Sequence, residues 1–226
     1  MTAAASDRFG VFTPEGLGPF DSSLAYYTAF AEQYLALIAE GQVCTEYPVD
    51  AYLTYRFLKD KAAPQLAQPS PKVPKSEKFF LKHVDDKGDH LLVDENLNVT
   101  GIIDWQMARV VPLREAFGPS LVTADIKSLC DGKVSLSDDD IALADALQEK
   151  GHTELASYIT DEKVRRFFRG LALEPKWSYA LPLANAILNA FGVGQDWTQW
   201  RVTALREYKT DERLKRLIHS ANFAPS

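Results

Sequence analysis

Large apolar residues recur at helical spacing along most of this chain. Between Leu24 and Ala39 they stand three or four positions apart, after a possible N-cap at Asp21–Ser23 and before Gly41. Pro48 can open a second helix that runs to about Lys61. Further helices are expected over 120–130, 152–159, 161–171, 183–191, 196–208 and 211–219. The pattern predicts a mainly helical protein.

A different pattern runs from His83 to Trp105. A loop rich in ionisable side chains leads into an apolar run at 91–93, a polar turn at 94–98 and a β-branched run at 99–103. Two such runs joined by a polar turn predict an antiparallel β-hairpin, so the fold class is α+β, mainly α with a small β-hairpin. Since antiparallel pairing brings the start of one strand beside the end of the next, His90 and Asp104 should lie at one end. Residues 79–81 predict a short buried strand before the loop.

The ionisable residues of this stretch suit phosphoryl transfer. Asp85 could accept a proton from a hydroxyl nucleophile, and His90 and Asp104 could hold a divalent cation. In protein-kinase-like enzymes, a catalytic-loop Asp orients the hydroxyl, while an Asn five residues later and an Asp beyond the next strand bind Mg²⁺. Here His90 lies five residues after Asp85, and Asp104 follows a strand.

The stretch resembles the catalytic and metal-binding segment of the aminoglycoside phosphotransferase family, in a fungal variant with the pattern Lys-His-x-Asp-x-Lys-Gly-Asp-His. The matching residues are Lys82, His83, Asp85, Lys87, Gly88, Asp89 and His90, followed by Ile103, Asp104 and Trp105. The resemblance implies the C-terminal lobe of a protein-kinase-like fold, with ATP and Mg²⁺ as cofactors and a small-molecule hydroxyl as the acceptor.

The resemblance also implies a role for each polar residue. Asp85 would be the catalytic base, Asp104 the main metal ligand and His90 a second ligand, while His83 would brace the loop by hydrogen bonds. His90 stands where the wider family has Asn, and imidazole is a softer ligand that suits Mg²⁺ less well than an amide oxygen. Asp104 together with Asp89 is therefore the alternative ligand pair.

The family's N-terminal lobe has no counterpart in the sequence pattern. That lobe supplies a Gly-rich phosphate loop and a strand lysine, and no strand–GxGxxG–strand pattern occurs in the 82 residues before His83. The expectation is one domain over 1–226 that resembles the C-terminal lobe alone, with the N-terminal lobe absent. It would comprise a loose segment over 1–20, a proline-rich loop over 62–76 and the catalytic hairpin over 79–105.

Two other functions stay open at this point. Without the phosphate loop, transfer would be weak or would need a lobe from another chain, and the protein could be a non-catalytic, truncated kinase-like binding module. A homo-oligomer or a partner protein would then cover the exposed face of the lobe. The third hypothesis is a metal-dependent hydrolase with zinc among His83, Asp85, His90 and Asp104.

Composition limits the partners. The net charge of −6 and the pI near 5.3 disfavour nucleic acid and anionic membranes, and they suit a neutral or cationic substrate. The most apolar stretch, 179–193, is too short to span a bilayer. Cys44 and Cys130 show no metal-binding spacing, and no secretory signal is visible, so a cytoplasmic location is expected.

The acidic run from Ser135 to Asp140 allows two interpretations. Ser137 can cap a helix whose first turn holds the carboxylates, which the helix dipole favours. Alternatively, the carboxylates form an anionic rim that attracts a cationic substrate. Capping is the preferred interpretation because it needs no further assumption.

Overall fold

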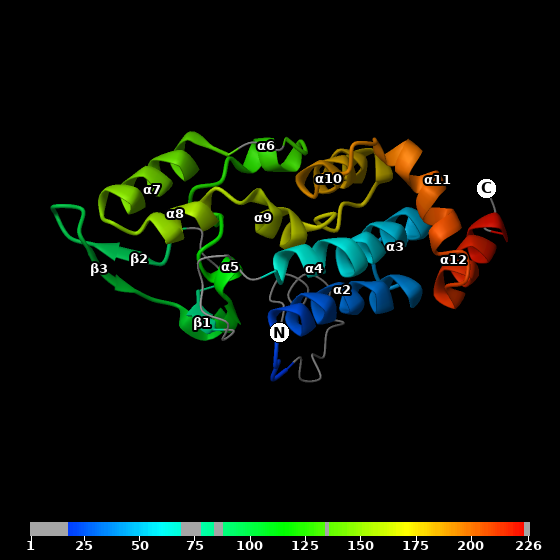
Figure 1. The fold of residues 1–226 in the computed structure, drawn as a ribbon, viewed down its shortest axis with the longest axis horizontal. Helices are drawn as coiled ribbons and strands as arrows, with labels where there is room; N and C mark the ends of the chain where they lie inside the picture. The colour runs from blue at the N-terminus through cyan, green and yellow to red at the C-terminus, as the bar shows by residue number, and fades with distance from the viewer. Residues whose placement is uncertain (1–17, 69–77, 84–87, 134–135, 224–226) are drawn as a thin grey trace. The chain divides into compact units, whose positions relative to one another are not determined.

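Most of the chain is helical, as the spacing of its apolar residues predicts (Figure 1). The computed structural model describes residues 18–68, 78–83, 88–133 and 136–223. The chain forms two units, each considered by itself. The hairpin unit comprises Met1–Pro19, Lys72–Ile126 and Ser135–Arg165, and the helical unit comprises Phe20–Pro71, Lys127–Val134 and Arg166–Ser226.

The helical unit is built on a core of aromatic and aliphatic side chains. Its main elements are α2 (Ser23–Ala39), α3 (Pro48–Phe57), η1 (Leu58–Ala62), α4 (Ala63–Leu66), α10 (Trp177–Ala190), α11 (Trp197–Glu207) and α12 (Glu212–Phe223). The rings of Tyr34 on α2 and Tyr55 on α3 stack with centroids 4.4 Å apart, and both side chains are buried. Two short helices, α6 (Ile126–Cys130) and α9 (Glu162–Arg169), have residues in both units.

The ends of α2 follow the predicted signals. Ser22 is the N-cap, and its side chain accepts a hydrogen bond from the backbone N–H of Ala25 at 3.1 Å. Gly41 follows the helix with a φ of +69°, the left-handed conformation that commonly ends a helix. These local rules predicted the helix to within one residue because neither end depends on distant contacts.

Two prolines lie inside helical segments, where the sequence predicted breaks. After α3 the chain continues through the π-helical turn η1 into α4, so Pro64 occupies the first turn of α4. The proline-rich loop expected from 62 therefore begins later, and residues 69–77 lie outside the described residues. Pro182 lies inside α10, which begins at Trp177 rather than at 183. Burial of one face of α10 outweighs the hydrogen bond that Pro182 cannot make.

All four strands of the described residues belong to the hairpin unit. They are β1 (Phe79–Lys82), β2 (Leu91–Val93), β3 (Val99–Ile102) and β4 (Arg109–Pro112), followed along the chain by α5 (Leu113–Ala116), α7 (Asp138–Glu149) and α8 (Thr153–Ile159). β1 pairs antiparallel with β4, and β2 pairs antiparallel with β3. The strand β1 was predicted to be buried, but Leu81 is 65% exposed. The strand β4 was not predicted, because four residues ending in proline carry little strand signal without their partner.

The β2–β3 hairpin confirms the prediction made from the two apolar runs. Leu91 pairs with Ile102 and Leu92 with Gly101, with an irregularity before Val93. In the turn, the Asp94 carboxylate accepts hydrogen bonds from the backbone N–H groups of Asn96 and Asn98 and from the Asn98 side chain. The Asn98 side chain, and then these backbone bonds, lower the pKa of Asp94. The turn is thus fixed by one short polar side chain.

No helix of the residues that the structure describes has the length and apolar character needed to cross a bilayer.

Gly132 and Gly41 form a matched pair for testing the packing of the helical unit. Both have positive φ, so alanine should cost each about 1 kcal/mol through the backbone. A Cβ at Gly132 would also lie 2.4 Å from the Pro182 carbonyl oxygen, whereas a Cβ at Gly41 would meet nothing within 4 Å. We expect urea unfolding to show that Gly132→Ala loses a further ~1–3 kcal/mol. Equal losses would contradict the packing of Gly132 on α10.

Candidate active site

Two histidines form the centre of the site. His83 follows β1 and His90 precedes β2, and both side chains are buried. Their rings stack with centroids 3.9 Å apart and an interplanar angle of 14°. His83 Nε2 lies 3.0 Å from the carbonyl oxygen of Ile103. Because a carbonyl oxygen can only accept, Nε2 carries the proton and donates it. His83 therefore ties the loop to the end of β3, the bracing role that the sequence analysis expects of it.

The hairpin gathers His90 and Asp104 at one end, as predicted. The backbone N–H of Ile103 donates to the His90 carbonyl oxygen at 3.0 Å, which extends the strand pairing one residue beyond β3. Asp104 is the next residue along the chain. The antiparallel pairing of β2 and β3 thus places His90 close to Asp104.

Asp104 adopts a left-handed backbone conformation, with φ of 65° and ψ of 46°. This conformation costs a non-glycine residue about 1–2 kcal/mol, although Asp and Asn tolerate it best. Backbone atoms on its N-terminal side are held by two side chains: His83 binds the Ile103 carbonyl, and the Trp105 indole donates to the Ile102 carbonyl at 2.8 Å. The rings of His83 and Trp105 also meet edge to face, 5.1 Å apart. These contacts fix the backbone from which the exposed Asp104 carboxylate projects.

Of the other two predicted site residues, the structure describes Asp89 but not Asp85. Asp85 lies outside the described residues. Asp89 is well exposed, and its Oδ1 lies 3.4 Å from His90 Nδ1. The structure therefore brings His83, His90, Asp89 and the backbone of Ile103–Asp104 together, and it leaves Asp85 as a prediction. The carbonyl partners of His83 and Trp105 carry no sequence signal, since every residue has a carbonyl group.

Asp104 fits a magnesium ion better than His90 does. Mg²⁺ prefers oxygen ligands and is usually held by one or two carboxylates together with substrate phosphates. The Asp104 carboxylate is exposed, whereas the His90 ring is buried face to face with His83. Within the part of the chain that the structure describes, no group of three or more His, Cys, Asp or Glu side chains could hold a metal. A magnesium ion at Asp104 would need water and phosphate oxygens as further ligands.

The histidine pair does not suit the zinc site of the hydrolase hypothesis. Nitrogen lone pairs lie in the plane of each imidazole ring, and zinc binds them at about 2.0–2.1 Å in a tetrahedral arrangement. Two nearly parallel rings stacked 3.9 Å apart cannot direct their lone pairs at one ion in this way. The stacking favours a structural role for His83.

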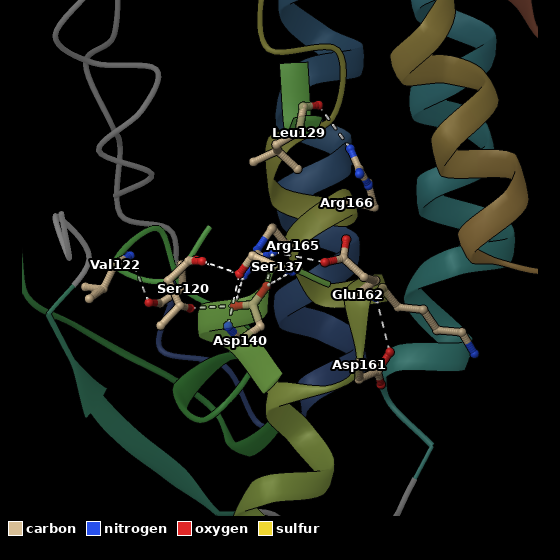
Figure 2. A network of polar contacts seen from close by, with 11 residues as sticks. Ser120, Val122, Leu129, Ser137, Asp140, Asp161, Glu162, Arg165 and Arg166 are labelled. Atoms are coloured by element: carbon tan, nitrogen blue, oxygen red, sulfur yellow. Dashed lines mark hydrogen bonds and ion pairs between the residues drawn. The ribbon is translucent and has the colours of Figure 1, made fainter. Parts of the chain in front are cut away.

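The structure at Ser137–Asp140 confirms the helix-capping interpretation of the acidic run. Ser137 and Asp140 form a capping box at the start of α7, and Asp140 is fully buried while its two acidic neighbours are exposed. Figure 2 shows the network around this helix end. Arg165 binds both oxygens of the Asp140 carboxylate, at 2.6 and 3.0 Å, and also contacts Glu162 and the Ser120 carbonyl. The role of Arg165 could not be predicted from the sequence, because 25 residues separate it from Asp140.

Hydrogen bonds around the buried Asp140 carboxyl lower its pKa. Burial alone would raise the pKa of this carboxyl, but hydrogen bonds from Arg165, the Thr123 hydroxyl and the Ser137 N–H hold the pKa below its ordinary value. Asp140 is therefore bound to its own protein and is not available to a substrate.

Comparison with protein-family models, curated proteins and solved structures found no significant match.

The Asp140–Arg165 pair should make the protein sensitive to acid. Asp140→Asn should lower the free energy of unfolding by about 3 kcal/mol at pH 7, because it removes the carboxylate that binds the buried Arg165 guanidinium through both oxygens and leaves Glu162 as its remaining ion pair. The exposed neighbour is the control, and Asp139→Asn should cost less than about 1 kcal/mol.

The sign of the pH dependence follows from the lowered pKa. Above the unfolded-state pKa of about 4, the Asp140 carboxylate contributes its full stability, and this is lost as pH falls through the lower folded-state pKa. Urea unfolding between pH 7 and pH 3 should therefore show the difference between wild type and Asp140→Asn shrinking below about pH 4. A constant difference would contradict an ionised Asp140.

Proposed function

We propose that this chain is a kinase-like phosphotransferase that uses Mg-ATP to phosphorylate a hydroxyl group on a small molecule. The observation that carries the proposal is the fixed, left-handed backbone of Asp104 at the end of the hairpin, beside the His83–Ile103 hydrogen bond. Backbone strain that is maintained by neighbouring side chains is a feature of functional sites. The proposal also rests on the sequence pattern from Lys82 to Trp105.

Each residue has a distinct task under this proposal. Asp104 would hold Mg²⁺, which neutralises charge on the transferring phosphoryl group when bound. Asp85, through the resemblance, would orient the acceptor hydroxyl and take its proton. His83 would hold the loop against β3, so that the distance between these two carboxylates stays fixed. Because phosphoryl transfer is mainly positioning and charge stabilisation, such bracing contributes directly to rate.

The charge of the protein suits a neutral or cationic acceptor. The net charge is −6, and residues 88–108 contain four acidic residues without Lys or Arg. A negative site would attract amines and repel additional anions. We therefore propose an acceptor that carries amino groups or no charge, and not a phosphorylated or carboxylated one.

A non-catalytic binding module is the second candidate. The 226 residues contain no Gly-rich phosphate loop between predicted strands, and the hairpin that bears Asp104 is almost wholly exposed. Exposed apolar strands are typical of surfaces that bind another protein. Nucleotide binding separates the two candidates, because only the first requires it.

Asp104→Asn tests the metal role with little disturbance of the backbone. Asn tolerates the left-handed conformation as Asp does, so the variant should unfold at the same urea concentration as wild type. Calorimetric titration with ATP should show Mg²⁺-dependent binding to wild type, in the micromolar range. The variant should bind Mg-ATP at least tenfold more weakly, and metal-free ATP with the affinity of wild type.

Asp85→Asn is the matched control for this experiment. It removes one carboxylate from the same segment, but it should leave Mg-ATP binding intact and abolish transfer to the acceptor. Equal Mg²⁺ dependence in wild type and Asp104→Asn would refute Asp104 as the ligand. No binding to wild type up to millimolar ATP would favour the binding module.

A further inference from the structure

The strand register of the β2–β3 hairpin places four aliphatic side chains on one face. The strand register pairs Leu91 with Ile102 and Val93 with Val99, and directly opposed residues share a face. Val93, Val99 and Ile102 are 53%, 58% and 41% exposed, while Leu91 is half-buried. We call these four residues the aliphatic face. Water reaches most of it in the isolated chain.

The hairpin lacks the cover that such a face normally has. Among the described residues, β2 and β3 pair only with each other, so each strand has one unpaired edge. A two-stranded hairpin is marginally stable alone, and it usually gains stability from a third strand or a packed helix. Leu92 on the opposite face is also 47% exposed. Added protein on this hairpin would therefore bury apolar surface that the described chain leaves in water.

The two edges differ in their readiness to accept a strand. On β3, the strand register skips Thr100, and the outward Ile102 carbonyl already accepts the Trp105 indole N–H. Such irregularities hinder further pairing. On β2, the Leu91 N–H already donates to the Gly88 carbonyl, but Asp94 N–H bonds toward the other strand, so alternation directs the backbone N–H and C=O of Val93 outward. The β2 edge therefore offers a new strand the backbone groups of Val93 and the carbonyl of Leu91.

The charges around the hairpin select the kind of partner. Residues 88–108 include the exposed carboxylates of Asp89, Asp94, Glu95 and Asp104, and no Lys or Arg. A second copy bound symmetrically would bring these carboxylates against their own equivalents, which costs energy. A partner with Lys or Arg beside its apolar residues would neutralise them.

We propose that the hairpin binds an extended segment of another protein in which apolar residues alternate with Lys or Arg. The segment adds to the β2 edge. The apolar side chains of the segment lie on one side of the added strand and continue the aliphatic face. Its basic side chains pair with the acidic rim, by which we mean the carboxylates of Asp89, Asp94, Glu95 and Asp104. This inference does not rest on the phosphotransferase activity, because the strand edge and the aliphatic face lie on β2 and β3, although two of the four carboxylates, Asp89 and Asp104, also lie at the proposed metal site.

The test uses three blocked seven-residue peptides and the full chain. One peptide alternates lysine with valine, one alternates glutamate with valine, and one alternates lysine with serine. Calorimetry reports binding of each peptide to the full chain. We expect the lysine–valine peptide to bind at least tenfold more tightly than either control, because only it matches both the charge and the apolar face.

Three variants locate the binding surface. Val93→Lys places a charge on the aliphatic face and should weaken binding of the lysine–valine peptide by at least tenfold. Glu95→Lys reverses one charge of the acidic rim and should weaken binding of the same peptide by about threefold. Val202→Lys is the matched control, since Val202 is 51% exposed on α11 outside the hairpin. It should bind as wild type does. Circular dichroism checks that each variant is folded.

Several results would overturn the proposal. Equal affinity for the lysine–valine and lysine–serine peptides would mean that net charge alone attracts the peptide. Equal weakening by Val93→Lys and Val202→Lys would place the site elsewhere. A dimer of the free chain in sedimentation, abolished by Val93→Lys, would make a second copy the occupant. Failure of Asp104→Asn to affect Mg-ATP binding would leave this proposal intact.

Discussion

The hydrogen bond from His83 to the Ile103 carbonyl is the constraint on which the site depends. His83 directly follows β1 and Ile103 directly follows β3, so this bond connects the end of β1 to the end of the hairpin. The stacked ring of His90 and the edge of the Trp105 ring pack against His83, whose side chain is buried. These contacts fix the backbone immediately before Asp104, whose own side chain is exposed to water.

The parts of the fold that local rules control could be predicted from the sequence. Ser22 and Gly41 mark the ends of α2, Ser137 starts α7, and the two apolar runs around the Asp94 turn form the hairpin. The parts that depend on distant partners could not. The strand β4 is defined only by its pairing with β1, and Pro182 is accepted within α10 because that helix is packed on the core. Of the candidate site, the shared end of His90 and Asp104 was predictable, whereas the backbone partner of His83 was not.

Asp140 differs from Asp89 and Asp104 in its burial and in its bonding partners. Asp140 is buried and held by Arg165, so its charge is committed to stability. Asp89 and Asp104 are exposed at one end of a hairpin, where a cation could reach them. The aliphatic face continues along the same hairpin. The proposed metal site and the proposed docking surface are therefore parts of one exposed hairpin in a mainly helical protein.

The most direct test of the metal site is paramagnetic broadening by Mn²⁺, which occupies the same oxygen ligands as Mg²⁺. Backbone amide signals of the ¹⁵N-labelled chain would be followed by NMR during titration with Mn²⁺ in the presence of ATP. The account predicts that the amides of Ile103, Asp104 and Trp105 broaden first. Earlier broadening at Asp138 and Asp139, the other exposed acidic pair, would contradict a metal site at the end of the hairpin.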